Sequence, residues 1–289
     1  KSYVIENTIK CVLSQTWKKI EILIINDAST DNTNLILEKL NNPRIKVYTN
    51  KNNLGVCHSR QIGIKKSTSK FICFLDDDDD WSPDHIENLI KTMQRTQSQI
   101  TISNYKTNIN GQLKEYYMHK FCDDFKKEIL NRQGPFLQCC LFKKNIFSNN
   151  IFFDKLATPC EDWDLFIQIS KGDYVISHSN HIGFTWNFTQ NSQSSNLTNE
   201  VKALEYIVDK NKQLIINTCG MKILSNHYRF IARVYEKIKN FDMATVKYKE
   251  AFFLSKTYYK NIFYIIFLFG NMNINYKIIN FLRKVRAII

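Results

Sequence analysis

The hydrophobic and polar positions of the first hundred residues follow two patterns that alternate along the chain. Apolar residues at helical spacing, such as Ile9, Val12 and Leu13, predict a first helix over 6–17. Short β-branched runs that end in polar residues are typical of buried parallel strands. Helices are predicted at 6–17, 29–40, 53–67 and 82–93, with strands at 20–27, 45–50 and 70–76. This alternation predicts an α/β protein with a mainly parallel sheet and helices on both faces.

The pattern changes after residue 100. Two alternating stretches flank Asn110-Gly111, a dipeptide that favours a tight turn, and they predict a β-hairpin. From about residue 200 the apolar positions keep helical spacing to the end of the chain. A boundary near 195–200 falls in the polar stretch NSQSSNLTN, which is typical of a linker. We therefore expect two domains, 1–198 and a basic, amphipathic helical C-terminal region over 199–289.

Charge distinguishes these two regions more clearly than composition does. The 289-residue chain has a net charge of +13, and the residues from 200 onward contain 16 Lys/Arg against 6 Asp/Glu, which is +10 of that total. Such a basic region predicts an anionic partner, either nucleic acid or a phospholipid surface. No nucleic-acid-binding motif accompanies it, so we expect an anionic membrane surface and no nucleic acid. A helical bundle with a solvated basic face is the simpler alternative.

Cysteine usage and hydropathy bear on the compartment. The eight cysteines show no C-x-x-C pair, and several, such as Cys73, lie in apolar runs as buried reduced thiols do. The chain opens without a signal-peptide pattern, and its most apolar stretch, 262–270, is less than half of the ~20 residues that a spanning helix needs. We expect a cytoplasmic protein without a membrane-spanning helix.

Five consecutive aspartates, Asp76 to Asp80, directly follow the predicted strand FICFL. Ligands of open α/β sheets bind outside the carboxyl ends of the strands, where Asp27 also stands after its own strand. Carboxylates at such a position suit a hard divalent cation that bridges to phosphate oxygens. A solvated acidic turn is the alternative, and the run by itself leaves the two interpretations evenly balanced.

A second acidic site opens the predicted helix in TPCEDWDLFIQISKG. Glu161 and Asp162 stand in its first turn, where the helix dipole alone favours acidic residues, and that interpretation is the stronger one without other context. A general base at the mouth of a cleft is the functional alternative. His178 and His181, in a predicted loop, are interpreted as surface or core residues rather than ligands.

Four sequence blocks stand in a fixed order over residues 9–167. They are CVLSQTWKKIEILIINDASTDNT, NLGVCHSRQIGI, FICFLDDDDDWSPDHIE and FFDKLATPCEDWDLF. In this order the blocks resemble the family 2 glycosyltransferases of the GT-A fold, over a little more than half of the chain. The resemblance implies a GT-A, Rossmann-like sheet with flanking helices in front of the helical C-terminal region. It also implies that the family's first strand is missing before KSYVIEN.

The resemblance implies a role for each matching residue of the donor site. Asp27 would contact the uracil of a nucleotide-sugar, and Arg60 would lie near the nucleotide. Asp76 and Asp78 match the outer residues of the family's D-x-D, in which Asp78 would ligate Mn²⁺ or Mg²⁺ on the diphosphate and Asp76 would approach the ribose or the metal. Asp77 fills the middle position of this nucleotide-sugar-binding motif.

Asp162 would be the catalytic base, with Glu161 and Trp163 beside it at the acceptor site, although a core position for Trp163 is an equal alternative. The resemblance thus implies an inverting, metal-dependent hexosyltransferase. It would move a hexose or N-acetylhexosamine from a UDP-sugar to a hydroxyl of a glycan or glycolipid acceptor. That acceptor would be a lipooligosaccharide, capsule or O-antigen precursor at the inner face of a bacterial cell membrane, where the protein would be peripheral.

Two departures from the family pattern bear on nucleotide binding. Asn26 replaces the first Asp of the family's pair, and His58 to Gln61 replace its A-R-N. Together with the missing strand, they leave a catalytically silent nucleotide-sugar-binding protein as the alternative to an enzyme. A basic nucleic-acid-binding protein is the less favoured alternative.

Overall fold

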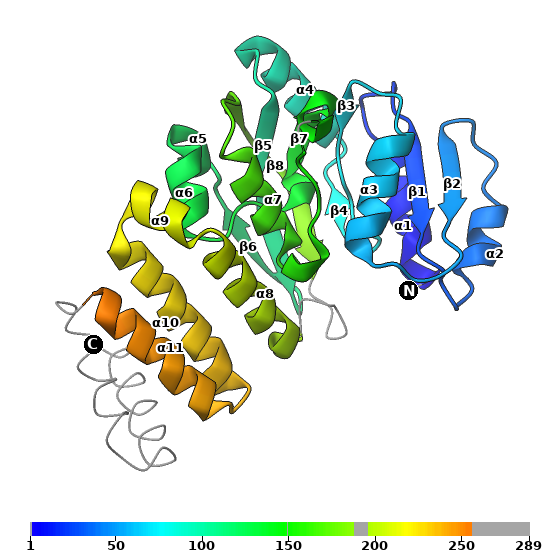
Figure 1. Ribbon diagram of the computed structural model, residues 1–289. Helices are drawn as coiled ribbons and strands as arrows, with labels where there is room; N and C mark the ends of the chain where they lie inside the picture. The colour runs from blue at the N-terminus through cyan, green and yellow to red at the C-terminus, as the bar shows by residue number, and fades with distance from the viewer. Residues whose placement is uncertain (1, 149, 188–195, 256–289) are drawn as a thin grey trace. The chain divides into compact units, whose positions relative to one another are not determined.

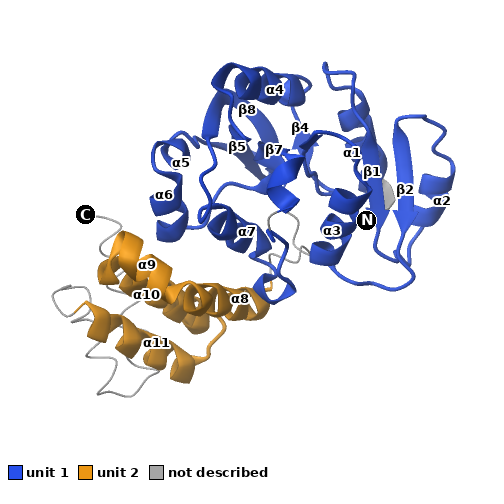
Figure 2. Cartoon of the chain, turned by 45° about the horizontal axis from the view of Figure 1, so that its top comes forward, with its two compact units in different colours: residues 1–192 blue, residues 193–289 orange. Residues whose placement is uncertain are grey.

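The computed structural model describes residues 2–148, 150–187 and 196–255. The chain forms two compact units, residues 1–192 and residues 193–289, which we call unit 1 and unit 2 (Figure 2). Unit 1 is an α/β unit, and the described part of unit 2 is helical. This division lies six residues before the boundary that the sequence predicts, at 192 instead of 198.

Unit 1 begins with the predicted alternation of helices and strands (Figure 1). Its first elements are α1 (Ser2–Leu13), β1 (Ile22–Asn26), α2 (Thr33–Glu38), β2 (Ile45–Thr49) and α3 (Val56–Lys66). The strands β1 and β2 are parallel, from Ile22 opposite Ile45 to Asn26 opposite Thr49. Helix α3 packs on β1 at Gly63, where an added Cβ would lie 3.8 Å from Cγ1 of Ile25. The predicted helices and strands of this part are confirmed; α1 begins and ends four residues earlier than predicted, and the other elements are shorter than predicted.

A second, six-stranded sheet forms the centre of unit 1. Its strands are β3 (Phe71–Ile72), β4 (Asp80–Trp81), β5 (Ile100–Ile109), β6 (Gln112–Tyr116), β7 (Cys140–Lys143) and β8 (Ile176–Asn187). They lie in the order β3-β7-β5-β8-β4, and β6 pairs with β5. The turn Asn110-Gly111 has φ of 51° and 82°, which confirms the predicted hairpin of β5 and β6.

The α/β class with C-terminal helices is confirmed, but strand direction differs from the expected mainly parallel sheet. Among the described strands only β1–β2 and β5–β8 are parallel pairs, whereas β5–β6, β5–β7, β3–β7 and β4–β8 are antiparallel. The helix-strand alternation ends at residue 96, and the hairpin then reverses the chain. The strand predicted at 70–76 shortens to two residues, Phe71–Ile72, and the chain rejoins the same sheet at Asp80, the last residue of the acidic run.

The remaining helices of unit 1 cover the central sheet and bring loops to its edge. They are α4 (His85–Thr96), α5 (Lys120–Asp123), α6 (Phe125–Asn131) and α7 (Glu161–Ile169), with short 3₁₀ turns η1 (Leu137–Cys139), η2 (Lys144–Ser148) and η3 (Lys155–Ala157). Helix α4 packs its apolar face on β5 and β8. Phe142, Phe166 and Phe184 are each at most 1% exposed, so the core lies between the sheet and α7.

Unit 2 contains α8 (Leu197–Lys210), α9 (Lys212–Cys219), α10 (Met221–Lys237) and α11 (Phe241–Leu254) in its described part. A buried ion pair ties three of these helices together. Nζ of Lys247, on α11, lies 3.0 Å from Oε1 of Glu205 on α8, and the hydroxyl of Tyr235 on α10 donates to Oε2 of Glu205 at 2.6 Å. Short connections between packed helices are typical of such bundles.

Eight of the ten basic residues in the described part of unit 2 are exposed, and Arg229 and Lys247 are buried. The exposed ones are Lys202, Lys210, Lys212, Lys222, Arg233, Lys237, Lys239 and Lys249. The other basic residues of this region, the apolar stretch 262–270 and the helix predicted at the chain's end lie outside the described residues. Within the described ranges, no helix is both long and apolar enough to cross a bilayer. All eight cysteines are free thiols.

Candidate functional site

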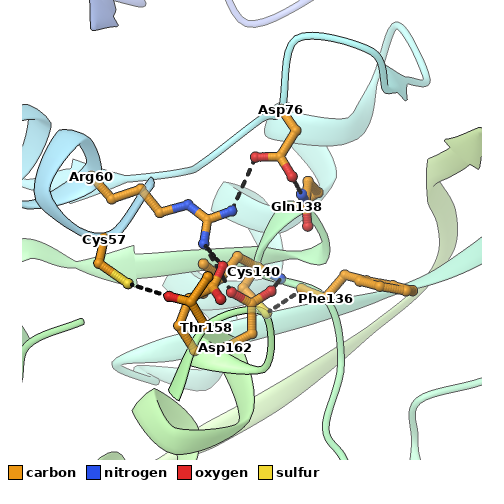
Figure 3. A network of polar contacts seen from close by, with 10 residues as sticks. Cys57, Arg60, Asp76, Phe136, Gln138, Cys140, Thr158 and Asp162 are labelled. Carbon is orange, nitrogen blue, oxygen red and sulfur yellow. Dashed lines mark hydrogen bonds and ion pairs between the residues drawn. The ribbon is translucent and has the colours of Figure 1, made fainter. Parts of the chain in front are cut away.

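Arg60 of α3 stands at the centre of a carboxylate cluster that joins three distant segments of unit 1 (Figure 3). Its Nη2 lies 3.0 Å from Oδ1 of Asp76, which follows β3. Its Nη1 lies 2.8 Å from Oε1 of Glu161 and 3.1 Å from Oδ1 of Asp162, in the first turn of α7. The Arg60 side chain is 10% exposed, so one desolvated cation faces three carboxylates. We call these four residues the Arg60 cluster.

Asp27 fixes the start of α3, and thereby the position of Arg60, through the loop before it. Its Oδ1 accepts from Nδ2 of Asn50 at 2.7 Å and from the backbone N–H of Leu54 at 2.9 Å. Its Oδ2 accepts from the N–H of Gly55 at 2.7 Å. Burial by itself would raise the pKa of Asp27, but these hydrogen bonds outweigh it and lower that pKa. Asp27 is therefore an ionised anchor of the loop that leads into α3.

Asp76 is held from its second side by a residue that sequence reasoning missed. Gln138 of η1, 2% exposed, donates from Nε2 to Oδ2 of Asp76 at 2.7 Å. The Gln138 carbonyl in turn accepts from Nε1 of Trp81 at 2.8 Å and pairs with Nε2 of His85 at 3.1 Å. No motif marks a lone glutamine 62 positions from its partner, so only the fold reveals this contact.

The five aspartates do not form one patch. The Asp77 carbonyl accepts from Oγ1 of Thr8 at 2.9 Å. Asp79 is 3% exposed, and its Oδ1 accepts from the N–H of Asn187 at 3.0 Å. Burial, together with the neighbouring carboxylates, raises the pKa of Asp79 to about 8. Asp80 instead accepts from Nδ2 of Asn187 at 2.9 Å. Asp79 and Asp80 thus contact Asn187, whereas Asp76 faces Arg60.

Asp162, the predicted base, combines a fixed position with access to solvent. Its Oδ1 pairs with Arg60, its Oδ2 accepts from the N–H of Leu137 at 3.3 Å, and its side chain remains 24% exposed. Burial raises the pKa of Asp162 to about 7; Arg60 opposes this rise, and the nearby carboxylate of Glu161 adds to it. A carboxylate with such a pKa suits general-base chemistry near neutral pH.

The neighbours of Asp162 have different surroundings. Glu161 is 7% exposed, and its Oε2 has no hydrogen-bond partner within the described residues. Trp163 is 3% exposed and donates from Nε1 to the carbonyl of Ile129 at 2.7 Å, as expected for the core position that the sequence left as an equal alternative. Its place on the inner face of α7 explains this burial.

His178 and His181 lie in β8 and not in the predicted loop, and both have structural partners. Nε2 of His178 pairs with Oδ1 of Asn104 at 2.7 Å. Nε2 of His181 lies 3.2 Å from Nδ1 of His85, and its Nδ1 pairs with Oγ of Ser179 at 2.8 Å. Because the Gln138 carbonyl only accepts, His85 carries its proton on Nε2, and His181 therefore donates to it. Both side chains are half-buried, and these contacts support their interpretation as structural residues rather than ligands.

A divalent ion at the acidic run would depend on a ligand for part of its shell. Within the described ranges, no group of three or more His, Cys, Asp or Glu side chains is placed to hold a metal ion. Asp76 and Asp78 nevertheless supply hard carboxylate oxygens, the donor type that Mg²⁺ and Mn²⁺ take, and such ions commonly combine one or two carboxylates with phosphate oxygens and water. The residues present fit an ion that binds together with a diphosphate.

The chain belongs to glycosyl transferase family 2, whose family model matches residues 2–156, just over half of the chain. Among curated proteins it is 28% identical over 206 residues to the UDP-Glc:alpha-D-GlcNAc-diphosphoundecaprenol beta-1,3-glucosyltransferase WfgD of Escherichia coli, which covers 70% of this chain and 78% of that protein.

Other matches are shorter. The glucosyltransferase WfaP of Escherichia coli is 38% identical over 98 residues, 34% of this chain and 39% of its own length. Glycosyltransferase GlyA of Streptococcus pneumoniae is 28% identical over 46% of this chain, and the match spans only 20% of GlyA.

Solved structures confirm the expected GT-A type of fold. TarS 1-349 of S. aureus, crystallised in complex with UDP-GlcNAc, has a TM-score of 0.62 at 16% identity and covers 89% of each chain. The mannosyltransferase PcManGT from Pyrobaculum calidifontis, in complex with GDP-Man and Mn²⁺, has a TM-score of 0.62 at 12% identity, over 87% of this chain and 72% of that one. At such identities the likeness concerns the fold alone.

Proposed function

We propose that this protein is an inverting glycosyltransferase that moves a hexose or N-acetylhexosamine from a UDP-sugar to a hydroxyl of a bacterial surface-glycan precursor. The observation that carries this function is Asp162, a fixed, partly exposed carboxylate whose pKa is raised to about 7 beside Arg60. The names of WfgD and WfaP specify a UDP-Glc donor and a diphosphoundecaprenol-linked acceptor, and TarS was crystallised with UDP-GlcNAc. These relatives support the same donor class and a lipid-linked or surface-glycan acceptor here.

Asp162 would act as the general base of the transfer. It would accept the proton of the acceptor hydroxyl as that oxygen attacks the anomeric carbon from the face opposite the leaving UDP. The bond between the sugar and the UDP oxygen breaks, and the configuration at the anomeric carbon inverts. Because Leu137 N–H and Arg60 hold both oxygens of Asp162, the base needs little reorganisation before it reacts.

The donor would bind along the carboxyl end of β1 and the acidic run. We assign Asp27 to the uracil side, where it already shapes the loop of residues 50–55, and Asp76 and Asp77 to the sugar-nucleotide. Asp78, together with Asp76, would hold Mn²⁺ or Mg²⁺ with the diphosphate. Such an ion neutralises the negative charge that develops on a leaving diphosphate. The protein's own part is to place these carboxylates.

The exposed basic residues of unit 2 would bind an anionic membrane. The eight exposed Lys and Arg side chains suit the cytoplasmic leaflet, at about 1 kcal/mol for each basic residue near the surface. This would place the protein as a peripheral protein at the inner face of the cell membrane, where lipid-linked acceptors are found. Cosedimentation with vesicles containing phosphatidylserine, lost at high salt, is the expected result; equal binding to neutral phosphatidylcholine vesicles would contradict it.

A donor screen tests the catalytic function. The full chain is incubated with MnCl₂ and a panel of UDP-hexoses and UDP-N-acetylhexosamines, and UDP release and protection from thermal unfolding are measured. We expect one sugar class to give turnover, whereas Asp162→Asn binds UDP and Mn²⁺ but does not turn over. Asp173→Asn, at an exposed position of unit 1, is the matched control. A chain that binds UDP-sugars without turnover would be the silent binder instead.

A further inference from the structure

We propose that Arg60 is a positioning residue that couples the carboxylate on the donor side, Asp76, to the base, Asp162, instead of contacting the nucleotide. This role rests on the proposed function of Asp162. The family resemblance places Arg60 near the nucleotide, but both of its terminal nitrogens donate to carboxylates of the protein, at 2.8 to 3.1 Å. A guanidinium group engaged in this way sets the distance between two reacting parts of the site.

The two carboxylates are each held from two sides. Arg60 binds Oδ1 of both Asp76 and Asp162. Two successive residues of η1 bind the opposite oxygens, because the N–H of Leu137 donates to Oδ2 of Asp162 and Nε2 of Gln138 donates to Oδ2 of Asp76. Figure 3 shows Arg60 reaching toward Asp76 at one end of its guanidinium group and toward Asp162 at the other. Arg60 and η1 therefore act together as a clamp that fixes Asp162 relative to Asp76.

Arginine is the side chain that this geometry requires. Its planar fork presents several N–H donors at fixed angles, whereas lysine is a compact point charge that cannot span two carboxylates in the same way. The guanidinium group also lies over the ring of Phe153, 5.5 Å from its centroid, and this contact further restricts its orientation. A nucleotide phosphate would find this cation already surrounded by three carboxylates, which repel a phosphate.

Arg60 also has an electrostatic effect on the base. The groups that face Asp162 are Arg60 on α3, Glu161 on α7, Asp76 after β3 and the Leu137 N–H of η1, with the thiols of Cys57, Cys139 and Cys140 nearby. Among them Arg60 alone is a cation. Its removal would leave Asp162 among carboxylates in a buried setting, so that the base would be protonated over a wider range of pH.

The test compares Arg60→Met and Arg60→Lys with wild type and with Arg132→Met. Arg132 is a matched control, since it pairs with Glu128 at 2.9 Å on the surface of α6. UDP release from the UDP-sugar that wild type turns over is measured from pH 5 to pH 9 with MnCl₂, and the affinity for UDP with Mn²⁺ is measured by calorimetry. For Arg60→Met we expect kcat to fall about 100-fold at pH 7, from a misplaced and protonated base.

The acidic limb of its pH profile should also move upward by about 1 unit or more, because an adjacent opposite charge shifts a carboxyl pKa by that amount. The dissociation constant for UDP and Mn²⁺ should stay within about 3-fold of wild type. Arg60→Lys should fold like wild type, but its kcat should remain as low as that of Arg60→Met. A dissociation constant raised 10-fold or more with an unmoved pH profile would show that Arg60 serves the nucleotide, and full activity of Arg60→Lys would show that no bridge is needed.

A measurement without turnover separates failure of this role from failure of the proposed function. Unfolding of Arg60→Met, Asp162→Asn and the double variant is compared at pH 8. If Arg60 is coupled to Asp162, the effect of the double variant on the unfolding equilibrium constant should differ from the product of the two single-variant effects by about 10-fold or more. If no UDP-sugar is turned over but this coupling is present, the clamp stands and the enzymatic function fails. Additive effects would overturn the coupling of Arg60 to Asp162.

Discussion

Two buried cations of this protein, Arg60 in unit 1 and Lys247 in unit 2, have similar surroundings and different consequences. Both are largely buried and both lie within 3.1 Å of carboxylates. Lys247 joins α8 and α11 inside a helical bundle, and the hydroxyl of Tyr235 satisfies the same glutamate. Burial would lower the pKa of Lys247, but the hydrogen bonds that it donates to Glu250 and Glu205 outweigh this effect and raise that pKa, so Lys247 stays charged.

The Arg60 cluster is not balanced in this way. Three carboxylates share one cation, Asp76 and Asp162 are 41% and 24% exposed, and burial raises the pKa of Asp162 toward neutrality. Partly accessible carboxylates with shifted pKa values are typical of functional sites, whereas an ion pair in which both charges are well paired is typical of a structural site. The two clusters are alike in burial and access, and they differ in charge balance, because three carboxylates share Arg60 and two share Lys247, and in the raised pKa of Asp162.

The largest expected effect is on the reaction itself. Asp162→Asn removes the proposed base, so we expect UDP release to fall about 10³-fold, within the range that general-base catalysis contributes. Initial rates at pH 8 with MnCl₂ and a saturating UDP-sugar check this. A variant with more than a tenth of the wild-type rate would assign the base elsewhere.

The next effect should fall on stability alone. Lys247→Met leaves the half-buried Glu205 without its cation, and we expect the free energy of unfolding of unit 2 to fall by up to about 3 kcal/mol. Urea unfolding followed by circular dichroism measures it. UDP and Mn²⁺ should bind this variant as they bind wild type; a changed affinity would mean that the two clusters are not independent.

A smaller effect is expected at the acidic run. Asp78→Asn replaces a charged oxygen ligand by a neutral one, and we expect affinity for UDP in the presence of Mn²⁺ to fall by about 10-fold or more. EDTA should weaken UDP binding to wild type and leave the variant little changed. Calorimetry with and without EDTA gives both values, and wild-type binding that is indifferent to EDTA would argue against a metal at this site.

The last effect is that of pH on the wild-type enzyme, which needs no substitution. The pKa of Asp162 is raised to about 7 in the folded chain, so the base is ionised only above that pH. Activity should rise about 10-fold per unit below pH 7 and level off above it. The sign is opposite for stability: a raised pKa contributes stability at low pH, and this contribution is lost as pH rises through 7. Asp162→Asn should therefore lose less stability than wild type between pH 5 and pH 8.

The sequence predicted helices, strands and turns well where these depend on residues that are close together in the chain. The helices of α1 to α4, the strands β1 and β2, and the hairpin at Asn110-Gly111 depend on periodicity and turn residues that lie within a few positions of each other. Strand direction in the central sheet was predicted wrongly, because it depends on how the chain crosses between distant segments. Trp163 shows the same limit, since its burial depends on Ile129 of α6, which no spacing reveals.

Of the candidate site, the sequence named Asp27, Arg60, Asp76, Glu161 and Asp162, and the fold places the last four in one cluster. Sequence reasoning missed Gln138 and Leu137, one because a lone amide carries no motif and the other because its contribution is a backbone N–H. It also took Asp27 for a contact of the nucleotide only, whereas three hydrogen bonds make it the anchor of the loop before α3.

The sequence by itself determined which chemical groups this protein has and at which strand and helix ends they stand. The arginine, the acidic run and the acidic helix start each lie in a short block of adjacent residues, and family membership follows from the order of these blocks along the chain. Only the tertiary structure decided which groups meet. Arg60 and Asp162 are 102 positions apart, and it is their desolvation together, with one cation for three carboxylates, that brings the pKa of Asp162 to about 7.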